Sequence, residues 1–385
     1  MMCKLPMHLP KELIRWRDAF FKLAGTNMLS GITFGQWLRM LRENRFSIDT
    51  IYYPRALLIT LSSISNSMAA ALEELRFGRA ITETKLPPPL FILGSWRSGT
   101  THLHNLLSRD HRFAFANQFQ VTYPNTFLLT ERSTAWLIER CIPKRRPQDS
   151  VAMSVSEPQE EDFALCASGQ VNLLAWTFPR NAQFYDRYMT LQSLSAAEGA
   201  RWRADYMRFL QKLTYKHRKP LVLKSPANTA RIKTLLELFP EARFVNIHRH
   251  PYDVFRSNEH TLLTAAPWWQ MQRMDFGSAS ERHSRILDLL GNLYEAYFAE
   301  RQLIPSGQFC DIAYEDLERD PIGQLRTIYA ALDLPDFKTA EAVLQTYVDS
   351  LAGYRKNCFA ELSPDLRKQI HERWRPCFDG WGYDA

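Results

Sequence analysis

The sequence has few features that would assign it to a functional class at once. Its six cysteines include no CxxC pair and no metal-ligand spacing, which argues against a zinc site or a redox dithiol. The net charge is +7 and the sequence pI is near 9.0, yet no run of five or six basic residues occurs. This balance favours an anionic ligand or an anionic membrane surface, and we expect no nucleic-acid partner.

Long hydrophobic segments are also scarce. The first 21 residues contain no apolar signal core, and scattered cysteines in a chain of this length predict buried thiols in a reducing compartment. We therefore expect a cytoplasmic protein. Residues 56–72 are uncharged but include six Ser, Thr or Asn, and they are fewer than the ~20 apolar residues that a membrane span needs. This stretch predicts a buried or interfacial helix and not a span.

The order of the sequence patterns predicts a helical segment followed by an α/β domain. Apolar residues recur at helical spacing in residues 34–44 and 68–78. The proline-rich stretch 85–94 then ends the helical part and begins a short apolar strand. We expect a helical N-terminal extension over residues 1–87, packed on a second domain over residues 88–385.

Beyond residue 88 the chain alternates between short apolar strands and amphipathic helices. The expected strands are residues 90–93, 220–225, 242–249 and 308–314. The expected helices are residues 99–109 and 228–239, one that begins at Pro251 and one with Pro321 near its start. Such alternation predicts a parallel sheet covered on both faces, a P-loop-like three-layer α/β fold. In such sheets ligands bind beyond the carboxyl ends of the strands.

The segment FILGSWRSGTTHLHNLL, residues 91–107, has the spacing of a phosphate-binding loop without its lysine. Gly94 and Gly99 bracket four residues, and Thr100 stands where the lysine of a nucleotide-binding loop follows the second glycine. Arg97 supplies a cation inside the loop instead. Backbone N–H groups and a positive helix end make such a turn an anion site. Because a terminal sulfuryl group carries one negative charge where a phosphoryl group carries two, a fixed cation and N–H donors can replace a metal.

A second anion-binding segment follows the expected strand 242–249. Arg249 ends that strand, and Ser257 lies eight residues later, two turns along the next helix. A strand-end arginine can chelate a phosphate through two N–H groups, and the hydroxyl adds a further donor. The presence of the loop favours anion binding over the alternative, a helix start with a surface arginine.

Together these segments resemble the PAPS-dependent sulfotransferases. That family has an SGTT-type loop for the 5′-phosphosulfate and an R-x-P…S segment for the 3′-phosphate, and YEDLERDP (314–321) matches its YEDL…DP element. The forms SWRSGTT, RPQDSVAM and PQEEDFAL are similar to the bacterial branch, which includes lipid and sterol sulfotransferase-like proteins. The resemblance is clearest from Pro88 to Leu334. It implies that residues 88–385 are a sulfotransferase domain, with PAPS as donor, PAP as product and no metal.

The resemblance also implies roles for individual residues. Those that match the donor site are, for the 5′-phosphosulfate, Arg97, Ser98, Gly99, Thr100 and Thr101, and, for the 3′-phosphate, Arg249 and Ser257. His102 takes the position of an adenine-stacking tryptophan. Tyr314 takes that of an adenine-side tyrosine, with a core residue as the alternative. Arg355 and Lys356 match a late basic loop over the 3′-phosphate, although Asn357 replaces its usual glycine.

Sulfuryl transfer to an alcohol needs a base for the hydroxyl proton and a charge that stabilises the leaving oxygen. Lys224 ends the expected strand and matches the family's strand-end lysine, which would stabilise the bridging oxygen. The alternative is a solvated lysine. The histidine that many relatives carry just beyond this strand is absent, because Pro226, Ala227 and Asn228 follow.

The acidic segment SEPQEEDFAL therefore supplies the candidate bases. We expect Glu160 to act as the base, with Glu161 second, through a pKa raised by burial. His104 in the loop helix is third, and a core position is its alternative. For the acids the alternative is ordinary helix-start chemistry, with Pro158 at the first helical position and carboxylates in the first turn.

The acceptor is indicated only by composition and by the resemblance. Aromatic residues gather at 173–188 and 266–272, and they predict either an apolar acceptor pocket or a core and lid. They favour a hydrophobic alcohol such as a sterol or lipid, and peripheral contact with a membrane is left open. Two other functions remain. A kinase-like phosphotransferase would need Mg·ATP and is disfavoured by the missing lysine. A non-catalytic nucleotide-binding or membrane-surface protein is compatible with the missing histidine.

Overall fold

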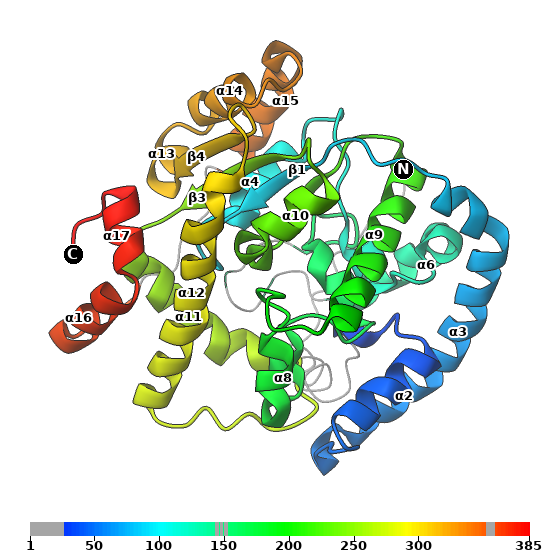
Figure 1. Ribbon diagram of the computed structural model, residues 1–385. Coiled ribbons are helices and arrows are strands. Elements are labelled where there is room, and N and C mark those ends of the chain that lie inside the picture. Colours follow the sequence, from blue (N-terminus) through cyan, green and yellow to red (C-terminus); the bar gives the residue numbers. More distant parts are fainter. Residues whose placement is uncertain (1–26, 143–145, 147–148, 150–152, 352–358) are drawn as a thin grey trace, which may run out of the picture.

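The computed structural model describes residues 27–142, 146, 149, 153–351 and 359–385, and its centre is a four-stranded parallel sheet (Figure 1). The strands are β1 (Leu90–Leu93), β2 (Val222–Lys224), β3 (Arg243–His248) and β4 (Phe309–Ala313). Their order is β2-β1-β3-β4, so β2 and β3 lie on opposite sides of β1. All four expected strands are confirmed, each within two residues at its ends.

Helices cover both faces of this sheet (Figure 1). The α-helices are α2 (Phe34–Glu43), α3 (Tyr53–Thr82), α4 (Thr100–Leu107), α5 (Gln118–Thr122), α6 (Phe127–Cys141), α7 (Leu174–Thr177), α8 (Ala182–Asp186), α9 (Ala196–His217), α10 (Ile232–Leu238), α11 (Pro251–Ala265), α12 (Ala279–Glu300), α13 (Tyr314–Arg319), α14 (Pro321–Ala331), α15 (Phe337–Ser350), α16 (Pro364–Arg373) and α17 (Arg375–Trp381). The 3₁₀ helices are η1 (Asn27–Leu29), η2 (Thr50–Tyr52), η3 (Glu161–Cys166), η4 (Pro179–Asn181), η5 (Pro226–Ala230), η6 (Ala266–Trp268) and η7 (Arg301–Leu303).

Side chains of β1 alternate between the two faces of the sheet and so divide the core. Leu90 and Ile92 pack with α4, α14 and α15, whereas Phe91 and Leu93 pack with α9 and α10. The strand ends align, because Ile92 lies in register with Lys224 of β2 and Val245 of β3. The expected three-layer α/β fold is therefore confirmed. In the strand order, the chain connections from β1 and β2 lead to strands on opposite sides of β1. The carboxyl end of a strand at such a reversal is the usual position of a ligand in parallel sheets.

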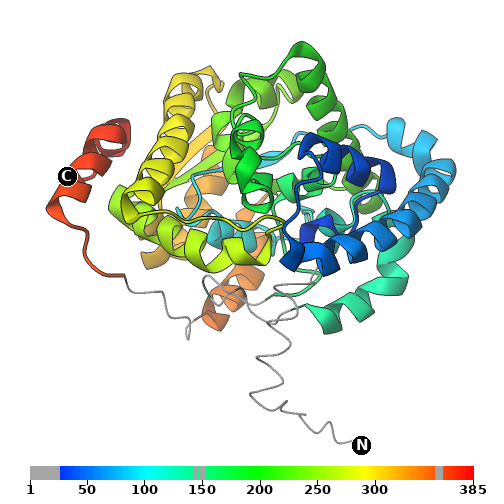
Figure 2. The same ribbon diagram turned by 90° about the horizontal axis from the view of Figure 1, so that it is seen from below.

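In the described N-terminal part, α2 and the long α3 lie at one edge of the molecule (Figures 1 and 2). Trp37 of α2 donates to Thr60 of α3 at 2.9 Å, and Trp37 and Ile59 share a core cluster with Phe91 of β1. The stretch expected to be a buried or interfacial helix lies in the middle of α3. It has one buried face and one exposed face, so a fully buried helix is wrong. The domain boundary between residues 87 and 88 stays a prediction.

The three cysteines whose side chains the structure describes carry no disulfide. Cys166, Cys310 and Cys377 are free and buried, as expected for structural thiols. Cys3 and Cys358 lie outside the described residues.

Candidate active site

The loop between β1 and α4 contains three residues with left-handed backbone conformations. Gly94, Arg97 and Gly99 have φ values of 140°, 72° and 103°. A Cβ on Gly94 would lie 2.5 Å from the carbonyl oxygen of Ile247, and one on Gly99 would lie 2.3 Å from the ring of Tyr314. Both glycines are therefore required by conformation and by space. Arg97 lacks that freedom, and backbone strain of this kind concentrates at functional sites.

Hydrogen bonds from three separate elements hold this loop. Thr229 of η5 accepts from the N–H at the start of the loop at 2.7 Å. Asn258 of α11 donates to the Trp96 carbonyl at 2.9 Å, and Tyr294 of α12 donates to Ser95 Oγ at 2.8 Å. Sequence reasoning missed these partners, because they lie 135 to 199 residues away and no motif marks them.

The guanidinium of Arg97 joins the two anion-binding segments that the sequence predicted. Its Nε donates to Ser257 Oγ on α11 at 2.8 Å. Its NH1 donates to Asp149 at 2.9 Å, and this buried carboxylate also accepts from Arg146 at 2.7 Å. The loop and the R-x-P…S segment therefore meet in space. Asp149 was not among the expected site residues, although it belongs to the RPQDSVAM stretch.

The hydroxyls around the second glycine have different orientations. Ser98 Oγ donates to the Ser95 carbonyl at 2.9 Å, within the loop. Thr100 is buried, and its methyl group lies close to Gly94. Thr101 Oγ1 lies 3.5 Å from Nζ of Lys224. Ser98 therefore stabilises the turn, whereas Thr101 connects α4 to the strand-end lysine.

Arg249 and Tyr314 form a second basic corner beside the loop. The Arg249 guanidinium lies over the Tyr314 ring, 4.6 Å from its centroid, and one of its NH2 groups is 3.4 Å from Asp253. Arg249 Nε is buried and has no hydrogen-bond partner among the described residues. Because a buried guanidinium N–H without an acceptor is costly, an anion such as a phosphate fits this corner. Tyr314 is half-buried and contacts Gly99.

Three further donor-site expectations have less structural support. His102 is half-buried, and burial lowers its pKa. Arg355 and Lys356 lie outside the described residues, as does Asn357, so their assignment to the 3′-phosphate stays a prediction.

At the end of β2, Lys224 faces the acidic segment. Its Nζ donates to Glu160 at 2.6 Å. The lysine side chain is 1% exposed and the glutamate side chain 15% exposed. Burial lowers the pKa of Lys224 although Glu160 acts in the opposite direction. A solvated strand-end lysine is therefore wrong, and Glu160 is the member of the pair that reaches solvent.

Glu161 lies deeper than Glu160. Its Oε1 accepts from Asn228 at 2.5 Å and from the Tyr206 hydroxyl at 3.2 Å. Its Oε2 is buried without a hydrogen-bond partner in the described part of the chain. Burial, with a smaller contribution from Asp162, raises the pKa of Glu161 from 4.5 to about 7. Asn228, which follows β2 by four residues, therefore binds this acid.

The acidic segment does not begin a helix at its proline. Pro158 forms an isolated β-bridge with Asn117, and η3 begins only at Glu161, with Glu160 as its N-cap. The Glu160 side chain makes no capping hydrogen bond and binds Lys224 instead. The alternative that placed Pro158 at the first helical position is therefore wrong. The alternative also placed carboxylates in a first helical turn, and this is confirmed for Glu161 and Asp162, which lie in the first turn of η3.

His104 occupies a core position. It is 1% exposed, and its ring lies edge-on to Phe115 with centroids 6.4 Å apart. Burial, together with the nearby charge of Lys224, holds its pKa well below the ordinary value. This placement fits the core alternative better than a base. Among the described residues no group of three His, Cys, Asp or Glu side chains is suited to a metal ion.

The aromatic segments contribute mainly to the core. Phe178 and Tyr185 are fully buried and stack with centroids 6.1 Å apart. Trp269 is half-buried and lies 5.8 Å from the ring of Phe163, in the turn that follows Glu161. Phe178 and Tyr185 therefore belong to the core, and the half-buried Phe163 of η3 and Trp269 pack against it near the acids.

Replacement of Glu161 by Gln is expected to change the pH dependence of stability. Because the folded protein holds this proton up to about pH 7 and the unfolded chain only to about 4.5, the free energy of unfolding should fall as pH rises between these values. The loss is about 3 kcal/mol, since one pKa unit corresponds to about 1.4 kcal/mol. Urea denaturation at pH 5 and pH 8 measures it. The variant should lack this decline, and an unchanged decline would contradict the raised pKa.

Known proteins resemble this chain over the residues that contain the loop and the second anion-binding segment. Residues 88–338 match the model of the sulfotransferase family. The omega-hydroxy-beta-dihydromenaquinone-9 sulfotransferase Stf3 of Mycobacterium bovis is 33% identical over 375 residues, which cover 97% of this chain and 94% of that protein. The protein of the same name from Mycobacterium tuberculosis has the same identity and coverage.

Solved structures support the fold. The sulfotransferase STF9 of Mycobacterium avium is similar with a TM-score of 0.67 and 16% identity, over 100% of this chain and 99% of that one. The sulfotransferase STF1 of Mycobacterium tuberculosis H37Rv has a TM-score of 0.64 and 18% identity, over 95% of this chain and 98% of that one. The helical N-terminal part is thus included in the similarity.

Proposed function

Because the chain belongs to the sulfotransferase family, we propose that it transfers the sulfuryl group of PAPS to the hydroxyl of a hydrophobic, lipid-like acceptor in the cytoplasm. The observation that carries the proposal is the contact between Arg97 and Ser257. It unites a lysine-free SGTT loop with the R-x-P…S segment at the carboxyl ends of β1 and β3.

The donor would lie across these two segments. The N–H groups at the start of α4 and the Arg97 guanidinium can bind the 5′-phosphosulfate. Arg249, whose buried Nε lacks a partner among the described residues, can bind the 3′-phosphate together with Ser257. A fixed arginine and N–H donors suit the single charge of the sulfuryl group, so we propose transfer without a metal.

The acceptor class follows from the relatives and from the side chains beside the acids. Stf3 is named for a menaquinone-derived hydroxyl compound, and Phe163 and Trp269 place apolar surface next to η3. We propose an acceptor with one hydroxyl on an extended apolar body.

In the proposed reaction Glu160 accepts the acceptor's hydroxyl proton as the oxygen attacks sulfur. The bond from sulfur to the bridging oxygen breaks in line with this attack. Lys224, 2.6 Å from Glu160 and 3.5 Å from Thr101, lies between the base and the loop. Its charge can therefore stabilise the leaving oxygen.

Calorimetry with adenosine 3′,5′-bisphosphate and with Mg·ATP tests the donor assignment. We expect tight binding of the bisphosphate and weakening by about 10- to 100-fold in Arg249→Ala, because a charge-assisted hydrogen bond contributes about 1.5–3 kcal/mol. Arg326→Ala, an exposed arginine on α14 that pairs with Glu341, serves as the control and should bind normally.

Two results would overturn the proposal. Preference for Mg·ATP would favour a kinase-like phosphotransferase. Tight bisphosphate binding without turnover of any hydroxyl acceptor, in wild type and Glu160→Gln alike, would favour a non-catalytic nucleotide-binding protein.

A further inference from the structure

Helix α3 has a continuous apolar face that the protein leaves exposed. We call it the α3 stripe, and its members share one side of the helix through spacings of one, three or four residues. It consists of Leu57, Leu58, Leu61, Ile64, Met68, Leu72 and Leu75, which are 41% to 86% exposed. At 1.5 Å per residue the stripe is about 27 Å long. Monomeric proteins seldom expose an apolar patch of this length without a partner.

The opposite face of α3 is fixed to the body of the protein. Arg55 is buried and donates to the Gln270 carbonyl at 2.5 Å, and the buried Glu73 pairs with Lys212 of α9. Residues 50–82 are long and apolar enough to cross a membrane by composition alone. Because Arg55 and Glu73 bind the body at both ends of the stripe, α3 lies along a surface with one face outward.

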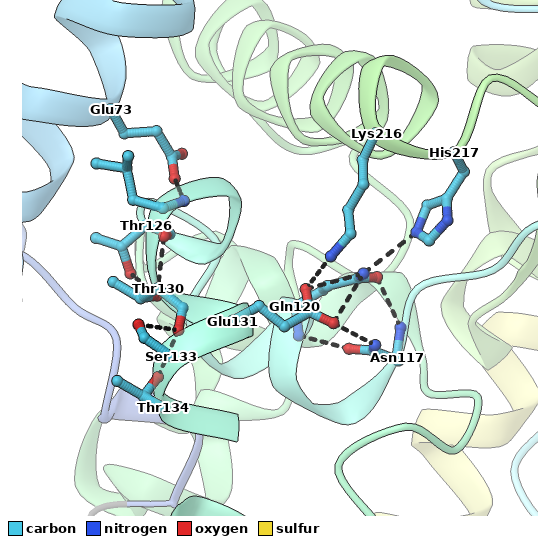
Figure 3. Close-up of polar contacts among 11 residues, drawn as sticks. Glu73, Asn117, Gln120, Thr126, Thr130, Glu131, Ser133, Thr134, Lys216 and His217 are labelled. Carbon is cyan, nitrogen blue, oxygen red and sulfur yellow. Dashed lines mark hydrogen bonds and ion pairs between the residues drawn. The ribbon is translucent and has the colours of Figure 1, made fainter. Parts of the chain in front are cut away.

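Helix α6 lies beside α3 and is anchored by its first half. Its Leu129 N–H donates to Glu73 of α3 at 3.0 Å. Figure 3 shows Glu131 of α6 between Asn117, which donates at 2.9 Å, and Lys216 of α9. These polar contacts fix the first two turns of α6 to α5 and α9, and in the second half one face of the helix is exposed.

The second half of α6 presents a tryptophan and a leucine between arginines. Trp136 and Leu137 are 57% and 51% exposed. The guanidinium of Arg140 lies over the Trp136 ring, 4.7 Å from its centroid, and Arg132 is exposed one turn earlier. Tryptophan and leucine with flanking arginine are the composition of a helix that lies in a membrane interface.

The charges on the two helices favour an anionic partner. Their acids are engaged within the protein: Glu73 with Lys212, Glu74 with Arg208, Glu131 with Lys216 and Glu139 with the Val155 N–H. By contrast, Arg76, Arg132 and Arg140 are exposed and form no ion pair with another described residue. A symmetric contact between two copies would bring these arginines against one another, whereas anionic lipid headgroups would pair with them.

We propose that the α3 stripe and the Trp136–Leu137 end of α6 bind the surface of a bilayer that contains anionic lipids. Along the chain, α6 ends at Cys141, and Asp149, eight residues later, binds Arg97 of the loop. If the proposed function holds, docking brings the enzyme to the lipid phase from which a hydrophobic hydroxyl acceptor comes. The docking rests on the exposed faces alone, and only the delivery of the acceptor rests on the proposed function.

Vesicle flotation tests the proposal with the full chain. The double variant Leu61→Glu/Met68→Glu places two charges in the α3 stripe, and Leu303→Glu on η7, at a leucine that is 48% exposed, is the matched control. Wild type and the control should float with phosphatidylglycerol-containing vesicles. The double variant should bind at least about tenfold less, because two apolar side chains that the bilayer would bury are replaced by charged ones. Arg132→Gln/Arg140→Gln should weaken binding to anionic vesicles and remove most of its salt dependence.

Other occupants of the surface would give different results. Absence of wild-type flotation at every vesicle composition overturns the proposal. So does a dimer in light scattering that Leu61→Glu/Met68→Glu dissociates, which would identify a second copy, or flotation only after removal of residues 1–26, which would identify a segment of the chain itself. Bisphosphate calorimetry on the same samples reports the proposed function separately, and the double variant should bind normally there.

Discussion

Arg97→Ala is expected to lower kcat/KM by about 10²- to 10⁴-fold. Arg97 is the one cation of the loop sequence GSWRSGTT, and loss of two charge-assisted hydrogen bonds at about 1.5–3 kcal/mol each corresponds to this range. Steady-state kinetics with PAPS and a soluble hydroxyl acceptor measure the loss. Most of it should appear in kcat if the guanidinium binds the sulfuryl group more tightly in the transition state than in the ground state.

Arg97→Lys separates charge from backbone strain. Both variants place a side chain at the same φ of 72°, so strain is shared and the difference between them reports the cation. We expect Lys to restore part of the rate but not the hydrogen bond from Nε to Ser257, because lysine has no planar fork. Equal kinetics for Ala and wild type would remove Arg97 from the mechanism.

Glu160→Gln is expected to reduce kcat by about 10²- to 10⁴-fold, the usual contribution of a general base. Donor affinity should not change, because Glu160 contacts Lys224 and no residue of the loop in the contacts described. The amide keeps the shape of the side chain but cannot accept the proton. Rapid-quench measurement of a single turnover isolates the chemical step.

Two comparisons decide whether this loss is catalytic. Thermal unfolding must show that the variant folds, since removal of one member of a buried ion pair can cost about 3–5 kcal/mol. Glu161→Gln should retain most of the turnover. A large loss in Glu161→Gln with an active Glu160→Gln would reverse the two assignments.

Much of the fold could be predicted because its signals are local. The strands are short apolar runs bounded by Gly or Pro, and β1 occupies the residues expected for it. Gly94 and Gly99 could also be predicted, because their spacing encodes the turn whose positive φ values the structure shows. Arg249 and Ser257 follow from the same kind of short-range pattern.

What could not be predicted depends on distant parts of the chain. Asp149 meets Arg97 across 52 residues, and Thr229 meets the start of the loop across 135. The alternative that placed Pro158 at a helix start is wrong because its bridge to Asn117 is a tertiary contact that overrides a favourable helix-start sequence. The exposed face of α3 could be predicted only in part, because an uncharged stretch of sequence does not specify which side of a helix packs against the rest of the protein.

The contact of Arg97 with Asp149 has a consequence for how ligands are exchanged. An anion that takes over this edge of the guanidinium replaces a carboxylate and not only water. The measured affinity is then the difference between two ion pairs, smaller than the strength of the new pair alone. When the product departs, Asp149 can pair with the arginine again. The Asp149 carboxylate thus competes with the ligand for Arg97, and the guanidinium need not be left without an anionic partner during exchange.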